Sequence, residues 1–176
     1  MKHTPVNEVL SWTSQDPRQS ALFNQWGAVV YRFHTETNST RSGVTILWRA
    51  VRSNKEDQVA RLEWAPDGGL GRATMGKNII PMVDLVRRET RMPNSRVFNG
   101  YDGLPYRWRP STTNQDILLI DPNNNVIAFI RITRPTRYHI GVVYAELHFV
   151  RSAGAGVVVW SSNYFKQLNR ADSDRL

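Results

Sequence analysis

Apolar and polar residues alternate along most of this chain, in short runs that are separated by turn-forming residues. Residues 138–151 hold the clearest of these runs. Period-2 alternation is typical of a β-strand that buries one face, so this run predicts a strand with an inward and an outward set. The inward set is Val143, Ala145, Leu147 and Phe149, and the outward set is Glu146 and His148.

Three other runs show the same period and predict strands over residues 43–52, 58–64 and 104–109. In each run one face is mostly apolar and the other carries polar or charged side chains. On the last strand, Arg107 and Arg109 are expected to face outward. The expected inward sets are Val44, Ile46, Trp48 and Ala50 in the first run, Ala60, Leu62 and Trp64 in the second, and Leu104, Tyr106 and Trp108 in the third.

Turn signals connect these runs at short intervals. The segments Pro66–Gly69, Asn99–Gly103 and Asp121–Asn125 are rich in Gly, Pro, Asn and Asp, which suit the backbone angles of tight turns. Short strands joined by tight turns predict a mainly β, antiparallel architecture. Both a sandwich and a closed barrel, of about ten to twelve strands, fit this pattern.

Two segments favour a helix. A short helix is expected over residues 82–88, because Pro81 suits the start of a helix. Residues 157–169 repeat apolar side chains near helical spacing, which predicts a C-terminal helix in or against the β-structure. The first part of that segment, Val157–Val159, suits a strand equally well.

The chain length predicts one domain. We expect a loose N-terminal arm over residues 1–19, with one helical turn around residues 7–12. A single β-domain is expected over residues 20–169, followed by a frayed tail over residues 170–176.

Three segments together resemble one protein family. They are Val97–Gly100 with Asp102–Arg109, Asp116–Leu119 with Asp121–Ala128, and Glu146–Phe149. This set resembles the fungal DUF6593 family. That family is similar to the tubby C-terminal-like superfamily, which includes the LURP-one-related proteins and the phospholipid scramblases. The resemblance implies a closed β-barrel around a largely apolar helix near the C-terminus.

The same resemblance bears on function. Tubby proteins bind phosphoinositides and scramblases move lipids, so the resemblance implies a role at lipids. The ligand residues of that superfamily do not map onto this chain, and no functional residue is carried over.

Composition limits the chemistry and the cellular location that we expect for this chain. Cysteine is absent, which excludes disulfides, a thiol nucleophile and cysteine-based zinc sites. The first residues lack the apolar core of a signal peptide, and no apolar run approaches the roughly 20 residues of a transmembrane helix. These features predict an intracellular, cytoplasmic protein, with a membrane-peripheral or nuclear location as alternatives.

The net charge of +8 points to an anionic partner. Only four of the 23 basic residues are lysines, and arginine binds phosphate through two parallel hydrogen bonds. In the alternative interpretation the arginines are dispersed and paired with acids such as Asp84, Glu89 and Asp102. The candidate anion-binding residues form two groups, Arg107, Arg109, Arg131, Arg134 and Arg137, and then Arg87 and Arg88.

No catalytic or metal-binding pattern is present in the sequence. The four histidines, His3, His34, His139 and His148, lack the spacing of zinc ligands. Glu146 and His148 share one strand face and can form a histidine–carboxylate pair, which is common on solvated sheets. We therefore expect no enzyme activity, no metal and no cofactor.

These observations predict a non-enzymatic intracellular binding module. Its expected partner is an anionic ligand or a phosphoinositide-containing membrane surface, bound through exterior arginines. A protein–protein adaptor or a self-assembling structural protein is the alternative, and nucleic-acid binding is a third hypothesis that rests on charge alone. The sequence gives no oligomeric state.

Overall fold

The computed structural model describes residues 8–16, 18–37, 43–52, 54–66, 69–85, 87–100 and 102–150. These residues form thirteen strands and one short helix, α1 (Met82–Leu85). The strands are β1 (Glu8–Trp12), β2 (Ser20–Phe23), β3 (Val29–Thr37), β4 (Gly43–Arg52), β5 (Lys55–Glu63), β6 (Arg72–Met75), β7 (Asn78–Pro81), β8 (Arg87–Glu89), β9 (Met92–Asn99), β10 (Pro105–Pro110), β11 (Ile117–Ile120), β12 (Val126–Tyr138) and β13 (Gly141–Phe149).

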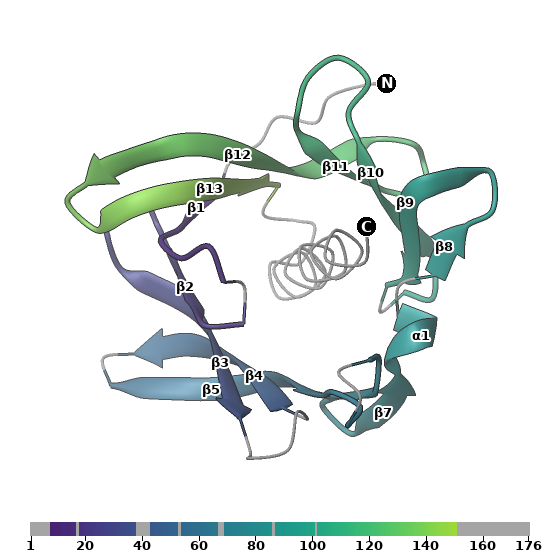
Figure 1. Cartoon of the computed structure of the whole chain (residues 1–176), viewed down its shortest axis with the longest axis horizontal. Helices are drawn as coiled ribbons and strands as arrows, with labels where there is room; N and C mark the ends of the chain where they lie inside the picture. Colours follow the sequence, from purple (N-terminus) through teal and green to yellow (C-terminus); the bar gives the residue numbers. More distant parts are fainter. Residues whose placement is uncertain are drawn as a thin grey trace.

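All of these strands belong to one antiparallel sheet, which confirms the mainly β, antiparallel prediction. The strand order is β7-β6-β5-β4-β3-β2-β1-β13-β12-β11-β10-β9-β8. Strands that follow each other in the chain pair with each other, except β7 and β8, and β1 pairs with β13. The sheet is therefore two meanders joined along β1 and β13. Figure 1 shows how it curls until its two edges face each other across α1.

The predicted closed barrel is wrong, because the sheet stays open between its edge strands β7 and β8. β7 has four residues and ends at Pro81, which has no N–H to donate, and β8 has three. The helical turn of α1 connects the two strands and packs against β7 and β9. The helix α1 therefore lies where β7 and β8 would have to form backbone hydrogen bonds with each other to close a barrel.

Two predicted segments differ from the structure or fall outside it. The expected helix over residues 82–88 ends at Leu85, and Arg87 and Arg88 belong to β8. The expected C-terminal helix over residues 157–169 and the tail over 170–176 lie outside the described residues.

The N-terminal segment differs from the loose arm that we expected. Residues 8–12 form β1, which lies inside the sheet and pairs with β13 over five positions and with β2 over two. Leu10 and Trp12 are buried, with exposed fractions of 3% and 0%. Only these two apolar side chains alternate, which is too short a pattern to distinguish a strand from a helical turn.

The core lies on the inner face of the curled sheet. Its largest fully buried side chains include Trp12, Phe33, Phe98 and Trp108. The predicted inward set of β13 is confirmed, because its burial alternates along the whole strand. On β10 the prediction holds for Trp108, whereas Leu104 precedes the strand and is 49% exposed.

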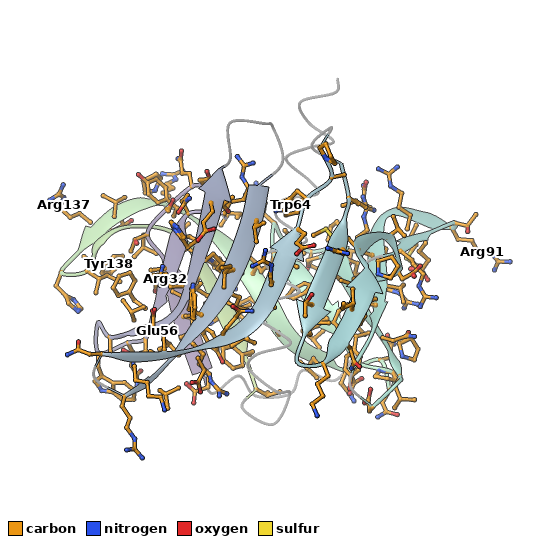
Figure 2. All side chains as sticks on the ribbon, turned by 90° about the horizontal axis from the view of Figure 1, so that it is seen from below. Arg32, Glu56, Trp64, Arg91, Arg137 and Tyr138 are labelled. Atoms are coloured by element: carbon orange, nitrogen blue, oxygen red, sulfur yellow. The ribbon has the colours of Figure 1, made fainter. Side chains whose placement is uncertain are left out.

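The predicted facing of β4 is wrong. Thr45 and Leu47 are the inward residues, at 0% and 1% exposure, and Leu47 pairs with buried Phe33. Trp48 instead lies on the outer face beneath Arg32, whose guanidinium carbon is 5.8 Å from the centre of the ring. Figure 2 shows Arg32, on β3, beside Glu56, on β5. Residues 46–48 are all large and apolar, so the sequence does not show which residues of this strand face inward.

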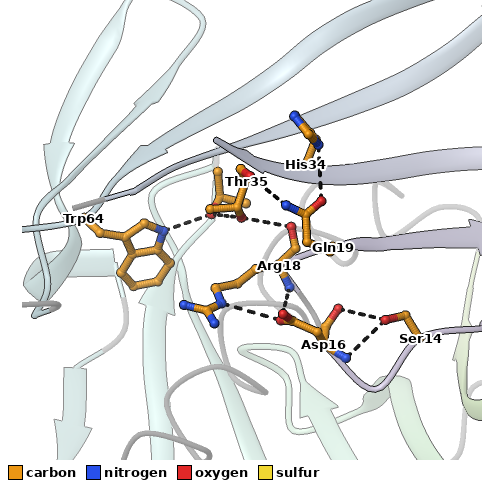
Figure 3. Close-up of polar contacts among 8 residues, drawn as sticks. Ser14, Asp16, Arg18, Gln19, His34, Thr35 and Trp64 are labelled. Carbon is orange, nitrogen blue, oxygen red and sulfur yellow. Dashed lines mark hydrogen bonds and ion pairs between the residues drawn. The ribbon is translucent and has the colours of Figure 1, made fainter. Parts of the chain in front are cut away.

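A polar network fixes the segment that leads from β1 into β2 (Figure 3). Trp64 Nε1 donates to Thr45 Oγ1 at 2.9 Å, and the hydroxyls of Thr45 and Thr35 are 2.7 Å apart. Thr35 Oγ1 donates in turn to the carbonyl of Arg18 at 2.9 Å. An indole N–H only donates and a carbonyl only accepts, so the Thr45 hydroxyl must donate to Thr35. The network therefore has one direction and holds residue 18 against β3.

Candidate anion-binding surface

The predicted arginines lie on three strands of one meander. Arg107 and Arg109 are on β10, Arg87 and Arg88 are on edge strand β8, and β12 carries the other three, Arg131, Arg134 and Arg137. In the sheet, β11 separates β12 from β10 and β9 separates β10 from β8. The two groups seen in the sequence therefore do not coincide with groups in space.

Most of the predicted arginines on strand faces are held by contacts within the fold. Arg107 Nη2 donates to Glu89 Oε1 at 2.9 Å. Arg131 donates to both oxygens of Asp116, at 3.1 and 2.8 Å, and covers the ring of Phe129 at 4.9 Å. These hydrogen bonds to Asp116 raise the pKa of Arg131 above its usual value. A guanidinium bound in this way is not available to an outside anion.

Three further predicted arginines also make contacts. Arg87 Nη2 donates to Asn99 Oδ1 at 3.1 Å, and its side chain is exposed. Arg88 and Arg109 each take part in a further contact of the fold. The alternative interpretation, in which arginines are dispersed and paired with acids, therefore holds for Arg107, which binds Glu89, one of the three acids it named.

Arginines on the other meander, β1 to β7, are also neutralised by carboxylates. Arg32 donates to both oxygens of Glu56, at 3.1 and 2.7 Å, which lowers the pKa of Glu56. Glu63 accepts hydrogen bonds from Arg72 and Arg61, and its pKa is also lowered, with Arg72 as the larger cause. Cross-strand arginine–carboxylate pairs are thus the general pattern on the outer face.

Arg134 and Arg137 are different. Both are exposed, and neither guanidinium forms an ion pair or hydrogen bond with any residue that the structure describes. They lie on the hairpin of residues 133–144, where β12 and β13 extend past their neighbours. The last register pair of β12 with β11 is Ile130↔Ile117, and that of β13 with β1 is Ala145↔Trp12. We call residues 133–144 the projecting hairpin.

Local sequence explains how the projecting hairpin presents these side chains. The register with β13 shifts between Ile132 and Thr136, a stretch that includes Pro135. Proline cannot donate a ladder hydrogen bond, so it is found at such bulges, where side chains are redirected. The Thr136 hydroxyl then donates to the carbonyl of Arg134 at 2.9 Å. No acidic residue occurs between Arg131 and Ala145, so no partner for the arginines is near in sequence.

A second turn packs against the projecting hairpin. Gly27, in the turn between β2 and β3, has φ of +79°, which favours glycine. A Cβ at this position would lie 2.7 Å from His139 Nε2 and 3.1 Å from Ile140 Cγ2. The two turns therefore touch at position 27, although they are far apart in sequence.

This contact brings two exposed aromatic residues to the same end of the molecule. Trp26 precedes Gly27 and is 76% exposed, and Tyr138 precedes His139 and is 51% exposed. We call residues 24–29 together with residues 134–140 the two-turn surface. Trp26 is not among the candidate residues predicted from the sequence. A tryptophan in a tight turn was itself the available signal, because such a residue has no core position to occupy.

Figure 2 shows where this surface lies relative to the other arginines. Arg137 and Tyr138 are at one end of the molecule and Arg91 is at the opposite end. Arg91 follows β8, which carries Arg87 and Arg88, so no single positive face includes both this turn and Arg137.

The described residues include one histidine–carboxylate pair. His148 lies 2.9 Å from Glu146 and stacks on Phe129, with ring centres 4.4 Å apart, so the expected histidine–carboxylate pair is present. Among described residues, no group of three or more histidines and carboxylates is placed to hold a metal ion. No helix within the described ranges is long and apolar enough to cross a membrane.

Comparison with known proteins gives a family but no biochemical activity. A model described as a family of unknown function, DUF6593, matches residues 15–170. Neither the curated proteins nor the solved structures include a match to this chain.

Proposed function

The chain belongs to the DUF6593 family, whose function is unknown, and from this premise we propose that it is a non-enzymatic intracellular binding module. Its proposed ligand is an anionic membrane surface, phosphoinositide-containing membranes included. The observation that carries the proposal is the projecting hairpin, where the guanidinium groups of Arg134 and Arg137 bind no described residue.

Charge and geometry both support this reading. An anionic membrane attracts each nearby arginine by about 1 kcal/mol, within a Debye length of the surface. That attraction requires guanidinium groups that project from the fold and are not neutralised. Arg134 and Arg137 meet this requirement, whereas Arg107 and Arg131 do not, because Glu89 and Asp116 already bind them.

Liposome flotation tests the proposal directly. Vesicles of phosphatidylcholine alone are compared with vesicles that also contain phosphatidylserine, with and without a phosphoinositide. We expect binding only to the anionic vesicles, and weaker binding as salt is raised. The R134Q/R137Q variant should lose roughly 25-fold in affinity, which is about 1 kcal/mol for each charge.

A matched control separates site from net charge. The R91Q/K77Q variant removes the same charge from two exposed cations outside the two-turn surface. We expect it to bind within about twofold of the wild type, since distant charges are screened. Absence of salt-sensitive binding to every anionic vesicle would sink the proposal, and equal losses in the two variants would show that only net charge matters.

One observation favours a second candidate function, protein–protein association. Edge strands β7 and β8 each have one side without a sheet neighbour, and Ile79 on β7 is 65% exposed. Such edges can add a strand from another chain. Light scattering over a wide concentration range tests self-assembly, and a monomer throughout would rule it out.

A further inference from the structure

We infer that the two-turn surface enters the interfacial layer of an anionic phospholipid bilayer, with Trp26 and Tyr138 as anchors and Arg134 and Arg137 at the lipid phosphates. This inference rests on the proposed function and adds a mode of binding to it. Shallow insertion is distinct from attraction at a distance, because it needs exposed aromatic side chains at the same place as the free cations.

Both kinds of side chain are present on this surface. Trp26 is 76% exposed and Tyr138 is 51% exposed, in a molecule whose other large aromatic residues include Trp12 and Trp108 at 0%. Tryptophan and tyrosine favour the membrane–water boundary, since their rings are largely apolar and their N–H or O–H groups stay hydrated. Val29, which follows the same turn, is 38% exposed and adds apolar surface.

The charges complement an anionic bilayer. The segment from Arg18 to Thr35 contains no acidic residue, and neither does the segment from Arg131 to Ala145. Every formal charge on the two-turn surface is therefore positive. Weak hydrophobic insertion and weak electrostatic attraction give stable membrane binding when they act together.

The contact at Gly27 makes the two turns one surface. A methyl group at position 27 would be strained at φ of +79° and would collide with His139 Nε2. Glycine thus lets the tryptophan-bearing turn lie against the arginine-bearing hairpin.

The arrangement at the other end of the molecule lacks the same combination. Arg91 is exposed in the turn between β8 and β9, and the neighbouring Met92 is 43% exposed. No aromatic residue follows them in that turn. Arg91 therefore provides a control position with charge but without an anchor.

Tryptophan fluorescence of the full chain tests the inference. Phosphatidylcholine–phosphatidylserine vesicles are prepared with and without brominated acyl chains, which quench tryptophan at close range. We expect the emission of the wild type to shift to shorter wavelength on binding and to be quenched by the bromines. The W26F variant should lose most of that quenching, because among the other described tryptophans Trp12 and Trp108 are buried in the core and Trp48 and Trp64 are partly buried.

Affinity measurements with three variants complete the test. We expect W26A to bind roughly tenfold more weakly, as the loss of one buried apolar side chain implies. G27A keeps every charge and both aromatic residues, and should also weaken binding severalfold. R91Q should bind like the wild type. Circular dichroism and thermal unfolding confirm that each variant is folded.

The outcomes distinguish this inference from the proposed function. Salt-sensitive binding with no quenching of Trp26 overturns insertion and leaves surface docking intact. Quenching that persists in W26F also overturns it, because another tryptophan would then be the anchor. No binding to any anionic vesicle overturns both proposals. Wild-type affinity in G27A would show that the joined turns are unnecessary.

Discussion

Arginines on the strand faces and arginines on the projecting hairpin have the same side chain in opposite surroundings. Arg32, Arg107 and Arg131 each bind a carboxylate from another part of the sheet, at 2.7 to 2.9 Å for the closest bond. Glu56 and Glu89 lie on strands, and Asp116 directly precedes β11. Arg134 and Arg137 lie where β12 and β13 have passed the ends of their neighbours. An arginine on a strand face thus forms an ion pair within the fold, whereas the guanidinium of a hairpin arginine is available to solvent or to a partner.

The difference shows that strand register, more than arginine density, decides where a basic surface forms. Arg131 and Arg134 are three residues apart. Asp116 binds the guanidinium of Arg131, whereas no described residue binds the guanidinium of Arg134. The same rule should hold for hydroxyl groups and for carboxylates. It predicts that polar groups within the sheet contribute to stability and that polar groups on the projecting hairpin do not.

Two threonines give the largest expected contrast. T45V removes the hydroxyl that accepts from Trp64 and donates to Thr35 in a site with 0% exposure. We expect a loss of about 1–3 kcal/mol in the free energy of unfolding, because the Trp64 N–H loses its acceptor and the buried Thr35 hydroxyl loses a donor. T136V removes a hydroxyl on the projecting hairpin and should change stability by less than about 0.5 kcal/mol. Urea denaturation measures both, and equal effects would contradict the comparison.

The pair formed by Asp116 and Arg131 should be the next most sensitive. D116N keeps the size of the side chain but offers the guanidinium only one oxygen in place of two. We expect a loss of about 1–2 kcal/mol in the free energy of unfolding, since Asp116 is 7% exposed. D57N is the control, because Asp57 and Arg49 are 3.7 Å apart and both half-exposed; it should cost less than about 0.5 kcal/mol. A larger effect in D57N would reverse this ranking.

Acidification should weaken the sheet through its carboxylates. Hydrogen bonds from Arg32 lower the pKa of Glu56, and those from Arg72 and Arg61 lower the pKa of Glu63. The unfolded chain therefore takes up these protons first, so stability is full above the usual glutamate pKa and falls as the pH drops through the lowered values. Urea midpoints measured from neutral to acidic pH should decrease, and the E56Q variant should decrease less. Midpoints that rise on acidification would contradict this sign.

The strand pattern predicted much of this fold because burial and alternation agree on the second half of β5 and on β13. It failed on β4, where Ile46, Leu47 and Trp48 are all apolar and period 2 has no visible phase. Closure of the sheet could not be predicted, because it depends on whether β7 and β8 reach each other in space. The structure puts α1 between them.

The candidate site was predictable only in part. The sequence indicated that Arg134 and Arg137 belong to a basic group, but it also included Arg131, whose partner Asp116 directly precedes the neighbouring strand β11. Pairing across strands depends on register, which residue spacing does not reveal. The approach of Gly27 to His139 joins opposite parts of the sequence and leaves no local signal.

The smallest expected effect on stability comes from replacing one arginine on a strand face, Arg32, and one on the projecting hairpin, Arg137. R32Q breaks a bidentate bond to Glu56 and uncovers Trp48, so we expect a loss of about 0.2–1 kcal/mol in the free energy of unfolding. R137Q removes the same charge from the projecting hairpin, where no described residue binds it, and stability should stay within about 0.5 kcal/mol of the wild type. Vesicle binding should respond the other way, with the larger loss in R137Q. If R137Q destabilised the fold more than R32Q, the hairpin arginine would have a structural partner, and its availability to a membrane would have to be abandoned.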